Sequence, residues 1–249
     1  AVSGQTYSRK VDYNVLSVLC SIAQSATKFS NDIRLLSHLK EVEEPFESKQ
    51  IGSSAMAYKR NPMRSERMAS LARYVICDSM NPAITASAQW FERTLDDSAN
   101  RRIAIPEAFL AVDAILALYN NIIGCLTLYP RIIAKHLSDE LPFMATENIL
   151  MYCVSKKGGD RQVLHEAIRQ HSVAASKAVK LEGKENDLLD RILKDATFGL
   201  SKEELDSILD VKAFTGRAEK QVEEYISEVV DPLLESNKDR IGGTNAINV

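Results

Sequence analysis

The stretch VLSVLCSIAQSATKFSNDIRLLSHL, residues 15–39, carries the clearest folding signal in the chain. Apolar residues recur there three or four positions apart, for example at Leu16, Leu19, Ala23 and Ala26. This spacing places them on one wide face of an α-helix, as in a helix that packs inside a bundle. We therefore expect a long bundle helix over residues 15–39.

Two more long helices are expected farther along the chain. One covers residues 64–80, where Asn81-Pro82 bends or restarts it. The other begins at Pro106, a residue that suits the first turn of a helix, and ends near residue 128. No glycine interrupts residues 54–123, and no period-2 run predicts a strand. Long apolar faces with few breaks predict an all-α fold in which antiparallel helices pack as a bundle.

The length and charge of the expected helical segments change after residue 129. Segments become shorter and more charged, and glycines at 158–159, 183 and 199 separate them. Helices are expected from Thr146, after a cap at Asp160, and after Thr215 or Gly216. We therefore predict two domains, a helical bundle over residues 1–128 and a smaller helical domain over residues 129–249.

Composition excludes several classes of function. Apolar residues make up 45% and charged residues 26% of the 249 positions, as in ordinary soluble globular proteins. A net charge of −3 gives no reason to expect nucleic acid as a partner, and no continuous apolar run approaches the ~20 residues that span a membrane.

The four cysteines lack metal-site spacing, so we expect buried reduced thiols, no metal and a cytoplasmic location. The start at Ala1 without methionine is expected to be a cut inside a longer protein.

One stretch does not fit the helical pattern. Residues 41–62, EVEEPFESKQIGSSAMAYKRNP, are polar and lie between two expected helices. Loops longer than about 12–15 residues in a compact domain are usually functional or disordered. Hydroxyl, ammonium and amide groups gathered at the positive end of the next helix would suit a carboxylate substrate. From the residues alone, a substrate-binding loop and a mobile surface loop both remain open.

The sequence of this loop resembles a known signature. Residues 52–62, GSSAMAYKRNP, are similar to the G-S-S-x-M-P-x-K-x-N-P motif of the fumarase/aspartase superfamily. The continuation YKRNPMRSER, residues 58–67, resembles the adenylosuccinate lyase family in particular, whereas fumarases tend to have GKVNP and argininosuccinate lyases QKKNP. The likeness extends to residues 3–7, 90–98, 141–148 and 214–218. Ala57 replaces the usual proline and is expected to loosen the loop without removing a catalytic group.

The resemblance implies a fold and a reaction. The chain would be the C-terminal half of the family's protein, comprising the end of the central long-helix bundle, with the signature loop at residues 41–63, and a small C-terminal helical domain. The implied reaction is β-elimination of fumarate from adenylosuccinate, giving AMP, and from SAICAR, giving AICAR, with no cofactor. Ser53 would be the general base, because it matches the first serine of the signature pair. Lys59 would stabilise the serine alkoxide, Asn61 would hold the aci-carboxylate, and Glu66 would orient this catalytic set.

Other matching residues imply the substrate contacts. Two-point binding of phosphate and carboxylate suits arginine, and the implied contacts are Gln5, Arg67, Arg93, Ser98 and Arg102. The family takes its general acid from a histidine in an N-terminal region, so the chain alone is expected to be inactive. The histidines of this chain, His38, His136, His165 and His171, match none of the family's histidine motifs. The resemblance also implies a homotetramer in which several subunits build each active site.

Three other readings compete with this one. Another lyase of the superfamily, such as argininosuccinate lyase, would share the loop but differ in the residues that flank Lys59. A structural protein on the same scaffold, as in lens crystallins, would not need the intact Ser53, Lys59 and Asn61. A helical scaffold or interaction module would explain the apolar faces but not the signature loop.

Overall fold

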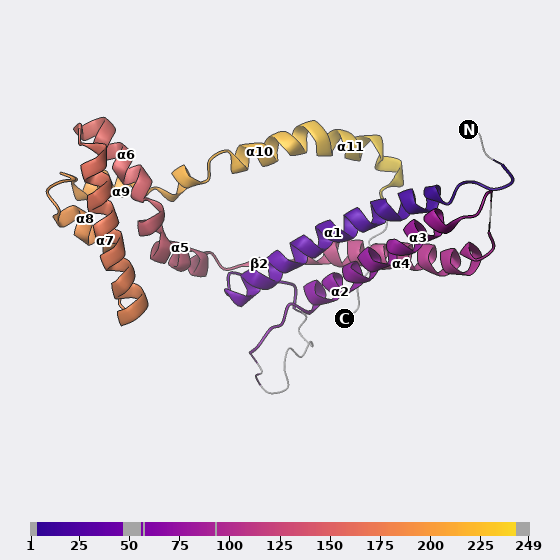
Figure 1. The fold of residues 1–249 in the computed structure, drawn as a ribbon. Helices are drawn as coiled ribbons and strands as arrows, with labels where there is room; N and C mark the ends of the chain where they lie inside the picture. The colour runs from indigo at the N-terminus through magenta and orange to yellow at the C-terminus, as the bar shows by residue number, and fades with distance from the viewer. Residues whose placement is uncertain (1–3, 47–55, 57, 93, 243–249) are drawn as a thin grey trace. The chain divides into compact units, whose positions relative to one another are not determined.

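The computed structural model describes residues 4–46, 56, 58–92 and 94–242, and almost every element in them is a helix (Figure 1). The predicted all-α fold class is confirmed. The chain divides after Pro130 into two compact units. We call residues 4–130 the N-terminal unit and residues 131–242 the C-terminal unit. The sequence placed this division two residues earlier, and the correspondence of the units to the family's domains stays a prediction.

The N-terminal unit is built from four helices around one apolar core. Its longest helix, α1, has the predicted buried face, since Leu16 and Ala23 are almost fully buried against α2 and α4. A short antiparallel pairing joins Val42 to Leu128 and Glu43 to Thr127. The elements are α1 Lys10–His38, β1 Val42–Glu43, α2 Met63–Asp78, α3 Met80–Ala88, α4 Asp97–Gly124 and β2 Thr127–Leu128.

Two hydrogen bonds fix the register of α2 and α3 against α4. The Tyr74 hydroxyl donates to Glu107, and the Asn100 amide donates to the Asn81 amide oxygen at 2.8 Å. Going seven residues forward along α2 and α3 therefore means going seven residues back along α4. The two segments are antiparallel, and this register allows positions along the bundle axis to be compared.

Helix α4 runs parallel to α1. Arg9, just before α1, forms a buried ion pair with Asp97 at the first residue of α4. Farther along, the rings of Phe29 and Tyr119 stack with centroids 4.3 Å apart. The starts of α1 and α4 therefore share one end of the bundle, which we call the α4-start end. The start of α2 lies at the other end, the α2-start end (Figure 1).

The prediction that a helix begins at Pro106 is wrong. Helix α4 begins at Asp97, nine residues earlier, and Pro106 lies inside it. The first turns are held by the Arg9–Asp97 ion pair and by burial of Ala104, which is 3% exposed. A proline inside a helix leaves the carbonyl four residues back without its donor. Here that carbonyl belongs to the exposed Arg102, so water can satisfy it.

By length and composition, α4 is the one helix of the described chain that could cross a membrane, with a mean hydropathy of 1.5 over its most apolar window. It buries Ala108 and Ile115 in the core shared with α1 and α2. On its other side, Phe109 and Leu110 are exposed. Its composition is therefore that of a bundle helix with one buried and one uncovered apolar face.

The C-terminal unit has its own core, which includes Ile149, Leu164 and Phe198. As predicted, α6 begins at Thr146, and the Asp160 carboxylate caps α7 by accepting hydrogen bonds from two backbone amides. The elements are α5 Pro130–Met144, α6 Thr146–Lys157, α7 Arg161–Glu182, α8 Leu188–Lys194, α9 Lys202–Ile208, the 3₁₀-helix η1 Val211–Phe214, α10 Ala218–Tyr225, the π-helical η2 Ile226–Val230, α11 Asp231–Ser236 and the 3₁₀-helix η3 Lys238–Arg240.

The cysteines differ from expectation in their burial. All four are free thiols, as predicted, but only Cys153 is buried. Cys77 and Cys125 are exposed because they lie on the outward side of α2 and just after α4. Apolar neighbours in the sequence therefore did not identify which thiols face the core.

Candidate functional site

A buried carboxylate holds the start of α2. Glu44 is 7% exposed, and its two oxygens accept hydrogen bonds from the backbone amides of Arg64 and Ser65, at 2.7 and 3.0 Å. The Ser65 hydroxyl donates to the same carboxylate at 3.0 Å. A helix begins with amides that have no partner inside the helix, and a carboxylate is favoured there by the helix dipole. Glu44 therefore acts as an N-cap that comes from twenty residues away.

The remaining amides of this helix end are also occupied. The Met63 amide donates to the Asn61 carbonyl at 2.8 Å, and the Glu66 amide donates to the Pro62 carbonyl at 2.9 Å. Glu44 thus occupies the first backbone amides of this helix, and the binding of a substrate carboxylate by the side chains gathered there stays a prediction.

A second carboxylate joins the beginning of the signature loop to its end and to the residue after β2. One oxygen of Glu43 accepts from the Arg60 guanidinium at 3.0 Å and from the Tyr129 hydroxyl at 2.8 Å. The Arg60 guanidinium also lies over the Phe46 ring, 5.0 Å from its centroid. The hydrogen bond to Glu43, together with burial, raises the pKa of Tyr129. The sequence did not predict the roles of Glu43 and Glu44, because residues 41–44, EVEE, are typical of an ordinary polar loop segment.

Four of the predicted site residues gather at the α2-start end. Lys59 and Glu66 are exposed, Asn61 is half-buried, and Arg67 is exposed directly after Glu66. No ion-pair partner of Lys59 is found in the part of the chain that the structure describes. Ser53, the predicted base, lies outside the described residues. Lys59 and Asn61, the predicted cation and amide, thus both lie in the short segment just before α2.

The other predicted contacts lie at the α4-start end. Arg102 donates a hydrogen bond to the Ser98 hydroxyl at 2.9 Å, one turn earlier on α4. The Gln5 backbone amide donates to the Glu92 carboxylate, which ties the start of the chain to the segment before α4. Arg93 lies outside the described residues. Gln5, Ser98 and Arg102 therefore form a second group of predicted contacts.

Charged groups fix the backbone at this second end. Burial alone would lower the pKa of Arg9, but the hydrogen bond and charge of Asp97 outweigh it and raise that pKa. The Tyr7 hydroxyl donates to Asp12 at 2.8 Å and accepts from Arg101. Burial, followed by the bond to Asp12, raises the pKa of Tyr7. These contacts join the segment before α1 to the first turns of α4.

The two groups of site residues are far apart within one chain. In the antiparallel register, Met63 lies eleven residues before Tyr74, and Arg102 lies five residues before Glu107. Sixteen residues of helical rise, about 24 Å, therefore separate Arg102 from the start of α2. One chain alone does not bring Lys59 and Asn61 together with Ser98 and Arg102 around a small molecule.

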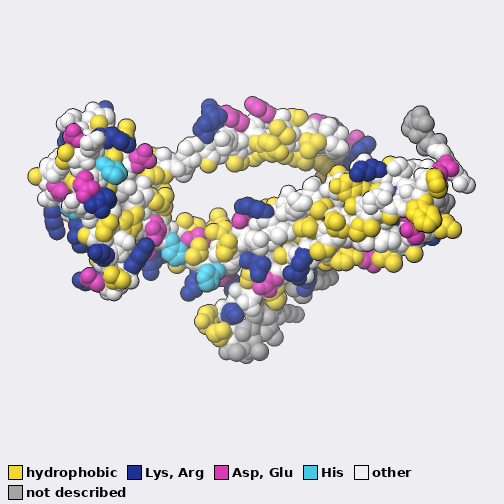
Figure 2. Space-filling view, viewed as in Figure 1, with side chains coloured by type: hydrophobic (Ala, Val, Ile, Leu, Met, Phe, Trp, Pro, Cys, Tyr) yellow, Lys and Arg dark blue, Asp and Glu magenta, His cyan; other side chains and the backbone are white. Residues whose placement is uncertain are grey.

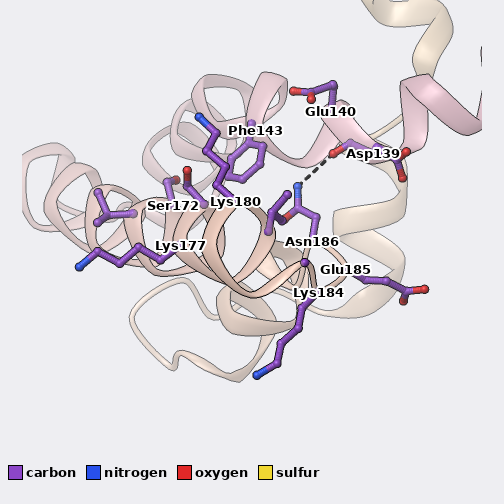
Figure 3. Close-up of a pocket in the computed structure, with 13 residues that line it drawn as sticks. Asp139, Glu140, Phe143, Ser172, Lys177, Lys180, Lys184, Glu185 and Asn186 are labelled. Atoms are coloured by element: carbon purple, nitrogen blue, oxygen red, sulfur yellow. Dashed lines mark hydrogen bonds between the residues drawn. The ribbon is translucent and has the colours of Figure 1, made fainter. Parts of the chain in front are cut away.

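Two cavities in the described chain lie away from these groups. The larger, of about 920 Å³, lies in the C-terminal unit between α5, α7 and the segment after α7 (Figure 3). It contains none of the predicted site residues, and the charged ends of Lys177, Lys180 and Lys184 point away from one another. A smaller one, of about 370 Å³, lies between α2 and α4 beside Asp78, whose pKa is raised by burial. The polar groups that line the smaller cavity bond to one another, since Asn81 donates to Asp78 and Asn100 donates to Asn81, both at 2.8 Å.

Two family models match the chain. The model described as "Lyase" matches residues 4–77, and the one described as "Adenylosuccinate lyase C-terminus" matches residues 142–225. Schizosaccharomyces pombe adenylosuccinate lyase is 52% identical over 240 residues, which are 96% of this chain and 50% of that protein. The Saccharomyces cerevisiae protein of the same name is 54% identical over 94% of this chain and 48% of its own length. The chain belongs to the adenylosuccinate lyase family. The family predicted from residues 52–67 is therefore confirmed.

The chain spans about half the length of these relatives. Solved structures agree on the fold. The 3-carboxy-cis,cis-muconate lactonizing enzyme from Pseudomonas putida superposes with a TM-score of 0.73 at 23% identity, over 87% of this chain and 46% of that one. A fumarate lyase from Mesorhizobium sp. BNC1 superposes with a TM-score of 0.68 at 21% identity, over 85% and 45%. At these identities the superpositions show a shared fold only.

Proposed function

We propose that this chain forms part of a lyase that eliminates fumarate from adenylosuccinate, giving AMP, and from SAICAR, giving AICAR. The observation that carries the proposal is the similarity, along almost the whole chain, to two yeast proteins named adenylosuccinate lyase. The residues around Lys59 support the same branch of the superfamily, because they follow that family's version of the signature.

The chemistry follows from the groups before α2. Ser53 removes the proton beside a succinyl carboxylate, and the electrons pass into that carboxylate, which becomes dinegative. Lys59 is exposed just before α2, and its positive charge stabilises the serine alkoxide. Asn61 donates to the developing anion. Because Glu44 occupies the helix end, these side chains and not the α2 amides carry the stabilisation.

The complete site is proposed to be shared between copies of the chain. Arg102 lies about 24 Å along the bundle from the start of α2, too far for both groups to bind one substrate molecule within a chain. In a homotetramer, Gln5, Ser98 and Arg102 of one copy meet Lys59 and Asn61 of another. The protonation of the leaving nitrogen is assigned to a histidine outside this chain.

Uncovered apolar faces support such an assembly. On α4, Phe109, Leu110 and Leu116 are 50%, 71% and 45% exposed, and on α1 Val18 is 60% exposed. Apolar side chains also gather on the bundle surface in Figure 2. Monomeric proteins rarely expose large contiguous apolar patches, whereas subunit interfaces are built from them.

The test is co-expression of this chain with the N-terminal half of the Schizosaccharomyces pombe relative. Fumarate release from adenylosuccinate is followed by absorbance. We expect activity only when both halves are present, and a loss of at least ~100-fold with Ser53→Ala. Ser70→Ala, the same change at an exposed position of α2, serves as the matched control and keeps full activity.

Other outcomes would redirect the assignment. Turnover of argininosuccinate in place of adenylosuccinate would identify another lyase of the superfamily. A well-folded assembly without activity on adenylosuccinate or SAICAR would favour a structural protein on the same scaffold.

A further inference from the structure

We infer that Glu44 is a positioning residue for the elimination, acting through the first turn of α2. This inference rests on the proposed function, because it concerns the same group of site residues. Glu44 itself is buried beneath the helix start and has no route to the substrate.

The first step is the completeness of the Glu44 contacts. Both carboxylate oxygens accept hydrogen bonds, from the Arg64 amide and from the amide and hydroxyl of Ser65. The next residue, Pro45, accepts at its carbonyl from the Arg64 guanidinium at 2.9 Å, and Arg64 is 1% exposed. The beginning of the signature loop is therefore bound to the first turn of α2, the helix that follows the loop. A set of buried, satisfied bonds of this kind permits one arrangement.

The second step links this arrangement to the predicted catalytic groups. The Asn61 carbonyl accepts from the amide of Met63, the first residue of α2, so the helix start determines where Asn61 lies. Lys59 is two residues earlier, and Glu66 directly follows Ser65. Lys59 and Asn61 thus lie just before the two amides that Glu44 binds, and Glu66 lies just after them in the chain.

The third step is the effect of replacing the Glu44 carboxylate with an amide. In Glu44→Gln the side-chain oxygen still accepts hydrogen bonds, but the NH₂ group is a donor that faces the Ser65 amide, also a donor. The first turn must shift to separate them. A displacement of about 1 Å at reacting groups costs up to about 100-fold in rate, even when the change is remote from the chemistry.

The test measures kcat and KM per folded assembly of the two co-expressed halves, well below the melting temperature. For Glu44→Gln we expect kcat to fall about 10- to 100-fold while KM for adenylosuccinate changes less than about threefold. The KM is retained because Ser98 and Arg102 hold the substrate from the other end of a neighbouring bundle. Asp160→Asn is the matched control, since it makes the same carboxylate-to-amide change at the cap of α7, and its kcat stays unchanged.

A purely structural cap would give a different result. If Glu44→Gln only lowers the melting temperature, and each folded assembly keeps the wild-type kcat, the inference is overturned. If Glu44→Gln does not fold, Ser65→Ala decides, because it removes one of the three bonds and keeps the carboxylate. We expect its kcat to fall about threefold, and an unchanged kcat overturns the inference. A wild-type assembly that releases no fumarate would instead contradict the proposed function.

Discussion

The two ends of the bundle are each held by a buried carboxylate, but the two carboxylates bind different kinds of partner. At the α2-start end, Glu44 accepts from two backbone amides and one hydroxyl. At the α4-start end, Asp97 pairs with the Arg9 guanidinium, and its second oxygen, Oδ1, finds no hydrogen-bond partner in the described chain. Both side chains lose their hydration, and only Glu44 recovers a partner for each oxygen.

This difference determines what each end can tolerate. The backbone amides that bind Glu44 are present whatever side chains follow, and the positive end of a helix already favours a carboxylate. Asp97 depends on one side chain, Arg9, and the desolvation of both charges offsets much of their attraction. The α4-start end should therefore be the more sensitive of the two to a single substitution, although replacing both partners together should cost little.

The largest expected effect is the loss of Asp97. Asp97→Ala leaves the Arg9 guanidinium, 3% exposed, without its counter-charge, which costs about 3–5 kcal/mol in the free energy of unfolding. Urea unfolding followed by circular dichroism measures this cost. The double variant Arg9→Met with Asp97→Leu should recover most of it. A single variant within about 1 kcal/mol of wild type would show that the pair does not hold this end.

The same contrast explains what sequence alone could predict. The face of α1 was predicted because its apolar period is local, and the Asp160 cap because it lies next to the helix that it caps. The start of α4 was missed, since the ion pair that extends the helix joins Arg9 to a residue 88 positions later. Glu44 was missed for a related reason, because its partners are backbone amides, which leave no trace in the sequence.

The sequence predicted which residues belong to the candidate site, but it did not predict how far apart they lie. A motif match assigns Lys59 and Arg102 by their identity, and it says nothing about the distance between them. That distance depends on the antiparallel register of α2 and α4, which two side-chain hydrogen bonds reveal only in the folded chain.

The next prediction tests whether the two ends serve one shared site. Lys59→Met and Arg102→Met assemblies should each lose about 100-fold in activity, because each lacks a charge that stabilises the bound anion. When the two variants are unfolded and reassembled together, about a quarter of the sites should receive an intact group from each of two copies and regain activity. Fumarate release by the mixture, compared with either parent reassembled alone, measures this recovery. A mixture no more active than its parents would show that both ends act within one chain or at separate sites.

The smallest expected effect concerns a third carboxylate, Asp195, which lies in the C-terminal unit and has no part in the proposed site. Its oxygens accept from the Thr197 amide at 2.9 Å and bind the His171 ring at 2.7 Å. These hydrogen bonds, first from Thr197 and then from His171, lower the pKa of Asp195 to about 2. A carboxylate whose pKa is lower in the folded chain stabilises it at pH values above the unfolded pKa, and this contribution is lost as the pH falls toward 2.

Asp195→Asn should therefore lower the free energy of unfolding by about 2 kcal/mol at pH 7, and the difference from wild type should shrink between pH 4 and pH 2. Denaturant unfolding at pH 7 and pH 3 measures both values, with Asp190→Asn on the exposed side of α8 as the control. A difference that is equal at both pH values would show that packing and not charge is lost. Because the bonds of Asp195 to Thr197 and His171 lie within the C-terminal unit, kcat per folded assembly should stay at the wild-type value, in contrast to Glu44→Gln. A carboxylate that fixes the backbone is thus expected to affect turnover only where the turn that it binds carries the reacting groups.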